Sequence, residues 1–122
     1  MRVLLVEDEP LVREVILRML ATTGVEVDAA GTYGEAAGMI ASTVYDLAVL
    51  DFRLPDGTGL DVLRNLMASQ PRAQAILITG EAEIERIREE ALALGAPDVL
   101  SKPGCVREIV TRVRSLSGPP PG

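Results

Sequence analysis

The sequence predicts an α/β domain, in which five parallel strands form a doubly wound sheet with helices on both faces. Short β-branched runs alternate with longer stretches of helical periodicity five times along the chain. Of the 122 residues, 48% are hydrophobic and 25% are charged, which suits one domain with a buried aliphatic core. This alternation implies parallel strands joined by helical crossovers.

The first two predicted strands flank the first predicted helix. Residues 2–6 (RVLLV) form a continuous apolar run, as a strand buried on both faces does. Pro10 favours the first turn of a helix whose apolar residues recur at helical spacing, and Gly24 ends that helix. Residues 25–29 (VEVDA) then alternate as a short strand.

The middle of the chain contributes a helix, a strand and a turn. Thr32 followed by Glu35 predicts a capping box, which opens a helix of small residues that runs to about Ser42. Residues 46–50 (DLAVL) form the third strand, and residues 53–59 (RLPDGTG) are typical of a turn.

The remaining elements alternate in the same order. They are a helix, the fourth strand, a strongly charged helix, a short fifth strand and a last helix, expected at about 60–68, 75–78, 81–94, 98–100 and 105–116. The domain therefore covers residues 1–116. Residues 117–122 (SGPPPG) are interpreted as a Pro/Gly-rich tail or a truncated linker.

Composition excludes several classes of function. The net charge of −6 argues against binding to nucleic acid or to anionic lipid, because both need a basic surface. The chain has no His and a single Cys, Cys105, which excludes His-based catalysis, the usual zinc sites and an internal disulfide. No run is apolar for the length of a membrane span, and no signal-peptide pattern is present, so a cytoplasmic protein is expected.

Polar side chains follow four of the five predicted strands, at the point where each ends. Glu7 and Asp8 follow the first strand, Asp51 the third, Thr79 the fourth and Lys102 the fifth. In doubly wound sheets ligands bind at the carboxyl ends of the strands, so we expect these side chains to converge. Each alone has an ordinary interpretation as a helix cap or a turn residue; their conjunction at one edge predicts a site.

The predicted cluster favours metal-assisted phosphoryl chemistry. Three carboxylates close together repel one another, and a divalent cation relieves the repulsion. Oxygen ligands without Cys or His select a hard ion, Mg²⁺ or Mn²⁺. A carboxylate can attack phosphorus, while Lys102 offsets charge on the transferred group and Thr79 donates a hydrogen bond to it.

These residues lie in motifs that resemble the receiver domains of response regulators, the phosphorylated switches of two-component signalling. The resemblance covers residues 2 to about 116. The matching stretches are LLVEDEP (4–10), DLAVLDFRLPDGTGLDVL (46–63), AILITG (75–80) and GAPDVLSKP (95–103).

The resemblance implies a flavodoxin-like fold with five helices and strand order 2-1-3-4-5. It also implies that Asp51 is the phosphoacceptor. Mg²⁺ would be held by Glu7, Asp8, Asp51 and the backbone carbonyl of Arg53.

Further roles follow from the same resemblance. Thr79 would be the switch hydroxyl, and Lys102 would contact the phosphoryl group, often before a cis peptide bond to the next residue, here Pro103. The donor would be a phosphohistidine on a histidine kinase or a histidine phosphotransfer protein. Apart from its own phosphorylation and dephosphorylation, such a domain catalyses no reaction.

Two interaction surfaces are predicted. The apolar residues of the first helix span about half of its circumference, more than one core face requires. The family pattern points to Leu11, Val12 and Val15 as the part that docks the phosphodonor; burial of all three in the core is the competing interpretation. A homodimer through the fourth helix, fifth strand and fifth helix is a further candidate.

One departure from the family pattern leaves an alternative open. Receivers usually carry an aromatic residue three positions before the lysine, and this chain has Val99 there. A degenerate receiver that docks partners without phosphorylation is therefore a competing hypothesis. A phosphatase of the haloacid dehalogenase type is a weaker one, since it would need a second Asp where this chain has Arg53.

Overall fold

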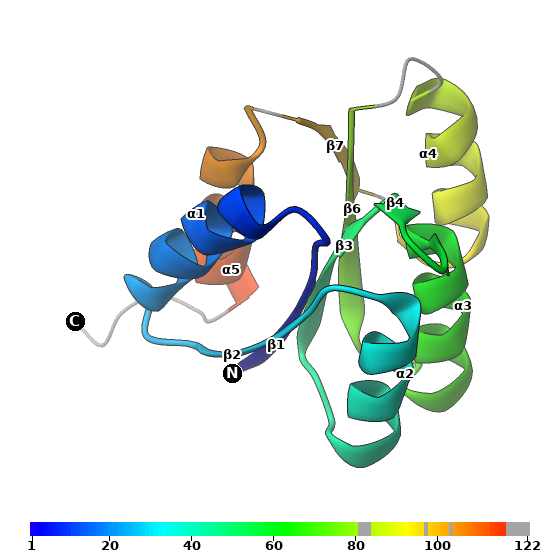
Figure 1. Cartoon of the computed structure of the whole chain (residues 1–122), viewed down its shortest axis with the longest axis horizontal. Helices are drawn as coiled ribbons and strands as arrows, with labels where there is room; N and C mark the ends of the chain where they lie inside the picture. The colour runs from blue at the N-terminus through cyan, green and yellow to red at the C-terminus, as the bar shows by residue number, and fades with distance from the viewer. Residues whose placement is uncertain (81–83, 97, 103, 117–122) are drawn as a thin grey trace.

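A computed structural model describes residues 1–80, 84–96, 98–102 and 104–116. These residues form a five-stranded parallel sheet with helices on both faces, and a separate two-stranded hairpin (Figure 1). The sheet strands are β1 (Arg2–Val6), β2 (Glu26–Ala30), β3 (Leu47–Asp51), β6 (Gln74–Thr79) and β7 (Asp98–Ser101). The hairpin strands are β4 (Arg53–Leu54) and β5 (Gly57–Thr58), and the helices are α1 (Pro10–Ala21), α2 (Tyr33–Ser42), α3 (Gly59–Ser69), α4 (Ile84–Ala93) and α5 (Val106–Leu116).

The sheet has the strand order β2-β1-β3-β6-β7, and every pair of neighbours is parallel. Counted along the chain without the hairpin, this is the predicted order 2-1-3-4-5, so the predicted fold is confirmed. The order reverses direction between β1 and β3, which is where a doubly wound sheet opens a crevice at the carboxyl ends of its strands.

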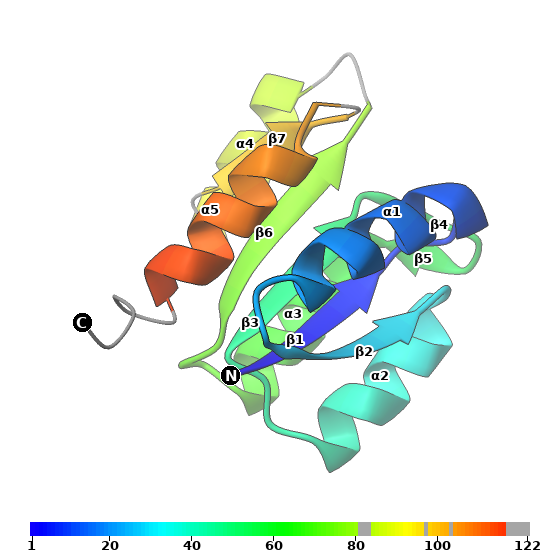
Figure 2. The same ribbon diagram turned by 90° about the vertical axis from the view of Figure 1, so that its left-hand side faces the viewer.

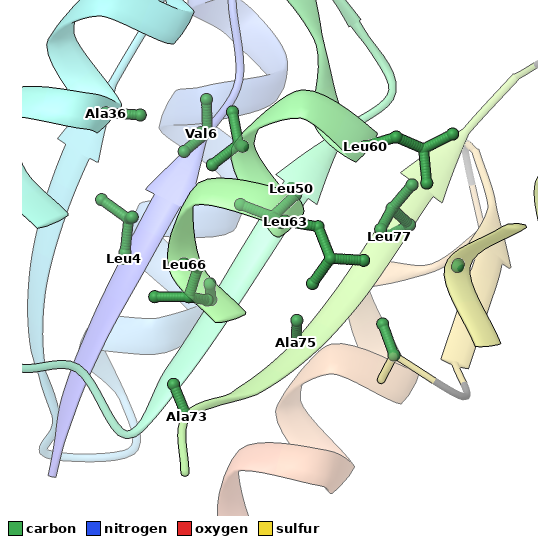
Figure 3. Packing of buried hydrophobic residues seen from close by; sticks show 14 of the residues in the cluster. Leu4, Val6, Ala36, Leu50, Leu60, Leu63, Leu66, Ala73, Ala75 and Leu77 are labelled. Atoms are coloured by element: carbon green, nitrogen blue, oxygen red, sulfur yellow. The ribbon is translucent and has the colours of Figure 1, made fainter. Parts of the chain in front are cut away.

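The sheet separates two apolar clusters. Helices α1 and α5 cover one face, and α2, α3 and α4 cover the other (Figures 1 and 2). On the three-helix face, Leu63 and Leu66 of α3 lie over Leu50 and Leu77 of the strands (Figure 3). All four are fully buried, and burying one such side chain stabilises the fold by about 1.5–3 kcal/mol.

Local signals place most helix ends as predicted. Pro10 is the first residue of α1, and Gly24 follows that helix with a φ of +79°, a conformation that glycine adopts without strain. Thr32 caps α2 by accepting a hydrogen bond from the Glu35 amide at 3.1 Å. Glu35 does not complete the expected box; its carboxylate accepts from the Gly31 amide, at 3.4 Å.

The predicted turn at 53–59 is more ordered than its composition indicates. Arg53 pairs with Thr58 and Leu54 with Gly57, which makes β4 and β5 a small antiparallel hairpin with Pro55 and Asp56 at its tip. Residues 81–83 of the predicted fourth helix, and the tail at 117–122, lie outside the described residues. None of the helices in the described part of the chain has the length and apolar character that a bilayer span requires.

Candidate functional site

The sheet brings the predicted site residues to one edge. Asp51 and Thr79 are the last residues of β3 and β6, and Glu7 and Lys102 directly follow β1 and β7. The register pairs Asp51 with Ile78 and Thr79 with Ser101, so all four positions lie at the carboxyl ends of adjacent strands. The strand arrows in Figure 2 point toward this edge.

Lys102 bridges two buried carboxylates. Its Nζ lies 3.0 Å from Asp51 Oδ1 and 3.0 Å from Glu7 Oε2, and it donates a hydrogen bond of 3.2 Å to Glu7 Oε1. Glu7 is fully buried and Asp51 is 4% exposed. The Lys102 amide also donates to the Thr79 carbonyl at 2.9 Å, which ties the backbone after β7 to the end of β6. The single lysine of the chain thus lies where a compact cation is needed.

Burial and unbalanced charge shift the pKa values at this edge. Burial raises the pKa of the Asp51 carboxyl; the hydrogen bond from Lys102 lowers it and the charge of Glu7 raises it again, to about 7. Burial also opposes the charge of Lys102, but its interactions with Asp51 and Glu7 outweigh burial, so the pKa of the ammonium group is raised. The positive charge of Lys102 is therefore not enough to keep the pKa of the Asp51 carboxyl at its ordinary value.

The acids fit a divalent cation. One carboxylate oxygen from each of Glu7, Asp8 and Asp51 lies within 4.8 Å of the other two. Lys102 approaches Glu7 Oε2 as an ion pair, but within the described residues no aligned hydrogen-bond donor reaches that buried oxygen. An oxygen-only set with an unsatisfied buried carboxylate oxygen and more negative than positive charge suits Mg²⁺.

The segment after Asp51 packs tightly against the site, through two features that the sequence analysis did not predict. A Cβ on Gly59 would lie 2.5 Å from the Asp51 carbonyl oxygen, so only glycine permits this approach of α3 to β3. Thr58 and Asp61 form a full capping box that starts α3 there. The Thr-x-x-Asp spacing could have revealed this cap, whereas the Gly59 contact has no local signal.

Backbone contacts also anchor Glu7, in a way that the sequence did not indicate. Arg13 of α1 donates a hydrogen bond from Nη1 to the Glu7 carbonyl at 3.0 Å, and the Glu9 amide donates to Glu7 Oε1 at 3.2 Å. A second acid also approaches Lys102, since Glu9 Oε1 lies 3.9 Å from its Nζ. These contacts fix the backbone and the carboxylate of Glu7 directly after β1, next to Lys102.

Val99 and Thr79 are both buried. Thr79 is 1% exposed, and Val99 packs with Ile87 and Ala91 of α4 in the three-helix cluster. The position that is aromatic in most receivers therefore lies in the core beneath α4 and holds a small side chain.

The predicted docking residues divide between surface and core. Leu11 is 83% exposed and Val15 is 51% exposed, whereas Val12 packs partly against the two-helix cluster. The interpretation that buries all three is thus wrong. Arg53 lies in β4 and its side chain is exposed, and Pro103 lies outside the described residues.

Comparison with known proteins gives one consistent result. The family model described as "Response regulator receiver domain" matches residues 3–114. The chain is 36% identical over 116 residues to the transcriptional regulatory protein PmrA of Pectobacterium parmentieri; the match covers 95% of the chain but 52% of that relative. The chain thus spans about half the length of this curated relative.

Solved structures agree in fold. A CheY-like response regulator receiver domain protein from Methanospirillum hungatei superposes with a TM-score of 0.86 at 29% identity, covering 95% of this chain and 93% of that one. The response regulator TrrA of Thermotoga maritima, solved in complex with Mg²⁺-BeF, superposes with a TM-score of 0.81 at 31% identity, covering 94% and 97%.

Proposed function

Because this chain belongs to the family of response regulator receiver domains, regulatory domains of two-component signalling, we propose that it is phosphorylated on Asp51 and acts as a conformational switch. One observation carries the proposal: Asp51 lies 3.0 Å from the only lysine, within an acidic cluster at the carboxyl edge of the sheet.

The proposed step is a phosphoryl transfer from a phosphohistidine. A carboxylate oxygen of Asp51 forms a bond to phosphorus as the phosphorus–nitrogen bond of the donor breaks, and the released imidazole takes a proton from solvent. Lys102 contacts the oxygens of the transferred group and offsets their charge, and the Thr79 hydroxyl donates a hydrogen bond to one of them.

Glu7, Asp8, Asp51 and the backbone carbonyl of Arg53 would hold Mg²⁺. The ion would supply positive charge against the phosphoryl oxygens. Few protein ligands and several waters make such binding weak without phosphate. Mn²⁺ has the same ligand preference and is expected to substitute.

Labelling with acetyl phosphate tests the assignment. We expect intact-mass measurement with Mg²⁺ to show one added phosphoryl group on the wild type and none on Asp51→Asn. Asp46→Asn, an exposed acid just before the same strand, is the matched control and should label like the wild type. Full labelling of the Asp51 variant would show that the phosphoacceptor lies elsewhere.

Metal dependence is tested separately. EDTA should abolish labelling of the wild type, and Asp8→Ala should remove the dependence of labelling on Mg²⁺. Labelling that proceeds equally in EDTA would exclude the metal.

The phosphodonor is proposed to dock on α1, and its partner is a histidine kinase or a histidine phosphotransfer protein. Leu11 and Val15 are one helical turn apart and exposed. Leu11→Glu should slow transfer from a phosphohistidine protein while leaving labelling by acetyl phosphate unchanged. Leu92→Glu, on α4 and 61% exposed, is the control and should affect neither.

A second candidate function is docking without phosphorylation, which the small Val99 side chain favours because it limits how a switch could be transmitted. Absence of any labelling in the first experiment, with binding to a partner retained, would select it. The homodimer face over α4, β7 and α5 remains a prediction, tested by sedimentation with and without beryllofluoride.

A further inference from the structure

Asp56 connects the segment after Asp51 to helix α2. The Tyr33 amide donates to Asp56 Oδ1 at 2.7 Å, and the Gly34 amide donates to Asp56 Oδ2 at 3.0 Å. Thr32 accepts from the third amide, that of Glu35. The first three amides of α2 therefore all have acceptors: Asp56, far along the chain, accepts from two of them, and the N-cap residue Thr32 accepts from the third.

The two bonds to Asp56 are charge-assisted. They lower the pKa of the Asp56 carboxyl, the Gly34 amide contributing most and the Tyr33 amide next. The positive end of the α2 dipole favours the same anion. Tyr33 also packs beside the hairpin, since a Cβ on Gly57 would lie 3.5 Å from its Cβ.

Asp56 occupies the tip of a hairpin whose base is fixed at the site. The Phe52 amide donates to the Ile78 carbonyl at 2.9 Å, and the Gly59 amide donates to the Phe52 carbonyl at 2.8 Å. Between these two points the chain leaves Asp51, passes through Arg53, turns at Asp56 and returns through Thr58, the partner of Arg53. Arg53 thus lies between the fixed base at Phe52 and the anchored tip at Asp56.

We propose that Asp56 is a positioning residue for the metal site: by anchoring the hairpin tip to α2, it holds the Arg53 carbonyl where a cation bound by Glu7, Asp8 and Asp51 can reach it. The inference rests on the proposed function, since it assumes that site. A backbone carbonyl has no rotamers with which to adjust, so the fold must place it. Mg²⁺ tolerates little departure from octahedral geometry.

The coupling is reciprocal. If the anchored hairpin favours metal binding, the bound metal favours the anchored hairpin by the same free energy. Mg²⁺ should therefore slow hydrogen exchange of the Tyr33 and Gly34 amides, although these lie on another element from every proposed ligand.

The test compares two ways of weakening the same helix end. Asp56→Ala removes the acceptor for the first two amides of α2, and Thr32→Ala removes the acceptor for the third without touching the hairpin. Mg²⁺ affinity is measured by NMR titration of the full chain, and the Tm of each variant in EDTA confirms that both are folded. Asp56→Asn keeps one side-chain acceptor oxygen and should be intermediate.

We expect the Kd for Mg²⁺ to rise about tenfold in Asp56→Ala, a loss typical of residues that orient metal ligands, and to stay at the wild-type value in Thr32→Ala. Protection of the Tyr33 and Gly34 amides by Mg²⁺ should disappear in Asp56→Ala alone. Equal affinities in the wild type and Asp56→Ala would overturn the inference and leave the metal site standing. No binding of Mg²⁺ by the wild type would overturn both.

Discussion

Replacing Asp51 by Asn should stabilise the metal-free protein at pH 8. The ionised Asp51 carboxylate is buried next to Glu7, and Lys102 neutralises only part of their combined charge. Asparagine has nearly the same shape and carries no charge, so the variant leaves a balanced pair between Glu7 and Lys102. We expect its free energy of unfolding in EDTA to exceed that of the wild type.

The size of the effect follows from the pKa of Asp51. It rises from 3.8 to about 7 on folding, and at about 1.4 kcal/mol per pH unit the ionised group costs at most about 4 kcal/mol. Lys102 is 16% exposed, so water reaches the edge and screens the charges. We therefore expect a gain of roughly 2 kcal/mol.

The stability gain of Asp51→Asn over the wild type must increase as pH rises. Because the pKa of Asp51 is raised in the folded state, the folded protein binds more protons than the unfolded chain between about pH 4 and pH 7. The contribution of Asp51 to the stability of the wild type therefore falls over that window as pH rises. The advantage of Asp51→Asn should be complete above pH 7 and vanish near pH 4.

Urea unfolding in EDTA at several pH values measures this, with Asp28→Asn as a control of opposite sign. The Tyr45 hydroxyl donates to Asp28 at 2.7 Å and Arg2 pairs with it at 3.2 Å, and these bonds lower the pKa of Asp28. Removing its charge should therefore destabilise the protein at pH 8, with the loss fading at acid pH. If Asp51→Asn is no more stable than the wild type at pH 8, the reasoning about unbalanced charge is refuted.

Three further predictions concern the surroundings of the site. Gly59→Ala should destabilise the protein by about 1–3 kcal/mol in urea unfolding and slow labelling, because its Cβ would meet the Asp51 carbonyl oxygen; an unchanged labelling rate would contradict a role at the site. Lys102→Met should cost about 3–5 kcal/mol in EDTA, since two buried carboxylates lose their counter-ion, and Mg²⁺ should restore part of it; stability equal to the wild type would argue against the ion pairs. Beryllofluoride should shift NMR signals around Thr79 more than those around Val99 and α5, and equal shifts would show that the small side chain transmits the change in full.

The fold and the centre of the site could be predicted because their signals are local. Apolar runs of strand length alternate with helical periodicity, and the rule that ligands bind at the carboxyl ends then selects Glu7, Asp51 and Lys102 without knowledge of any contact. Pro10 and Gly24 mark their helix ends because each has a backbone preference that acts within one turn.

What the sequence did not reveal depends on segments that meet only in the folded chain. Asp56 caps a helix that begins 23 residues earlier, and no spacing rule links the two positions. Gly59 is required by the approach of α3 to the backbone of Asp51. Glu35 shows the limit of the capping-box rule. The rule predicted that the Glu35 carboxylate accepts from the Thr32 amide, whereas it accepts from the Gly31 amide.

The charge balance at the carboxyl edge supports the proposed phosphorylation switch. Three carboxylates and one ammonium group need a divalent cation to approach neutrality. The proposed phosphorylation would replace the single charge of Asp51 by nearly two, and the edge would become negative again. The Thr79 hydroxyl is a neutral hydrogen-bond donor at the same edge. Thr79 is buried at the end of β6, and its position in that strand pairs with Ser101 of β7. In the proposed switch, movement of Thr79 toward the phosphoryl group would repack β6 against β7, where Val99 fills the space beneath α4. In the proposed switch, Asp51 would therefore set the driving force of the change, and the volume of Val99 would limit its extent.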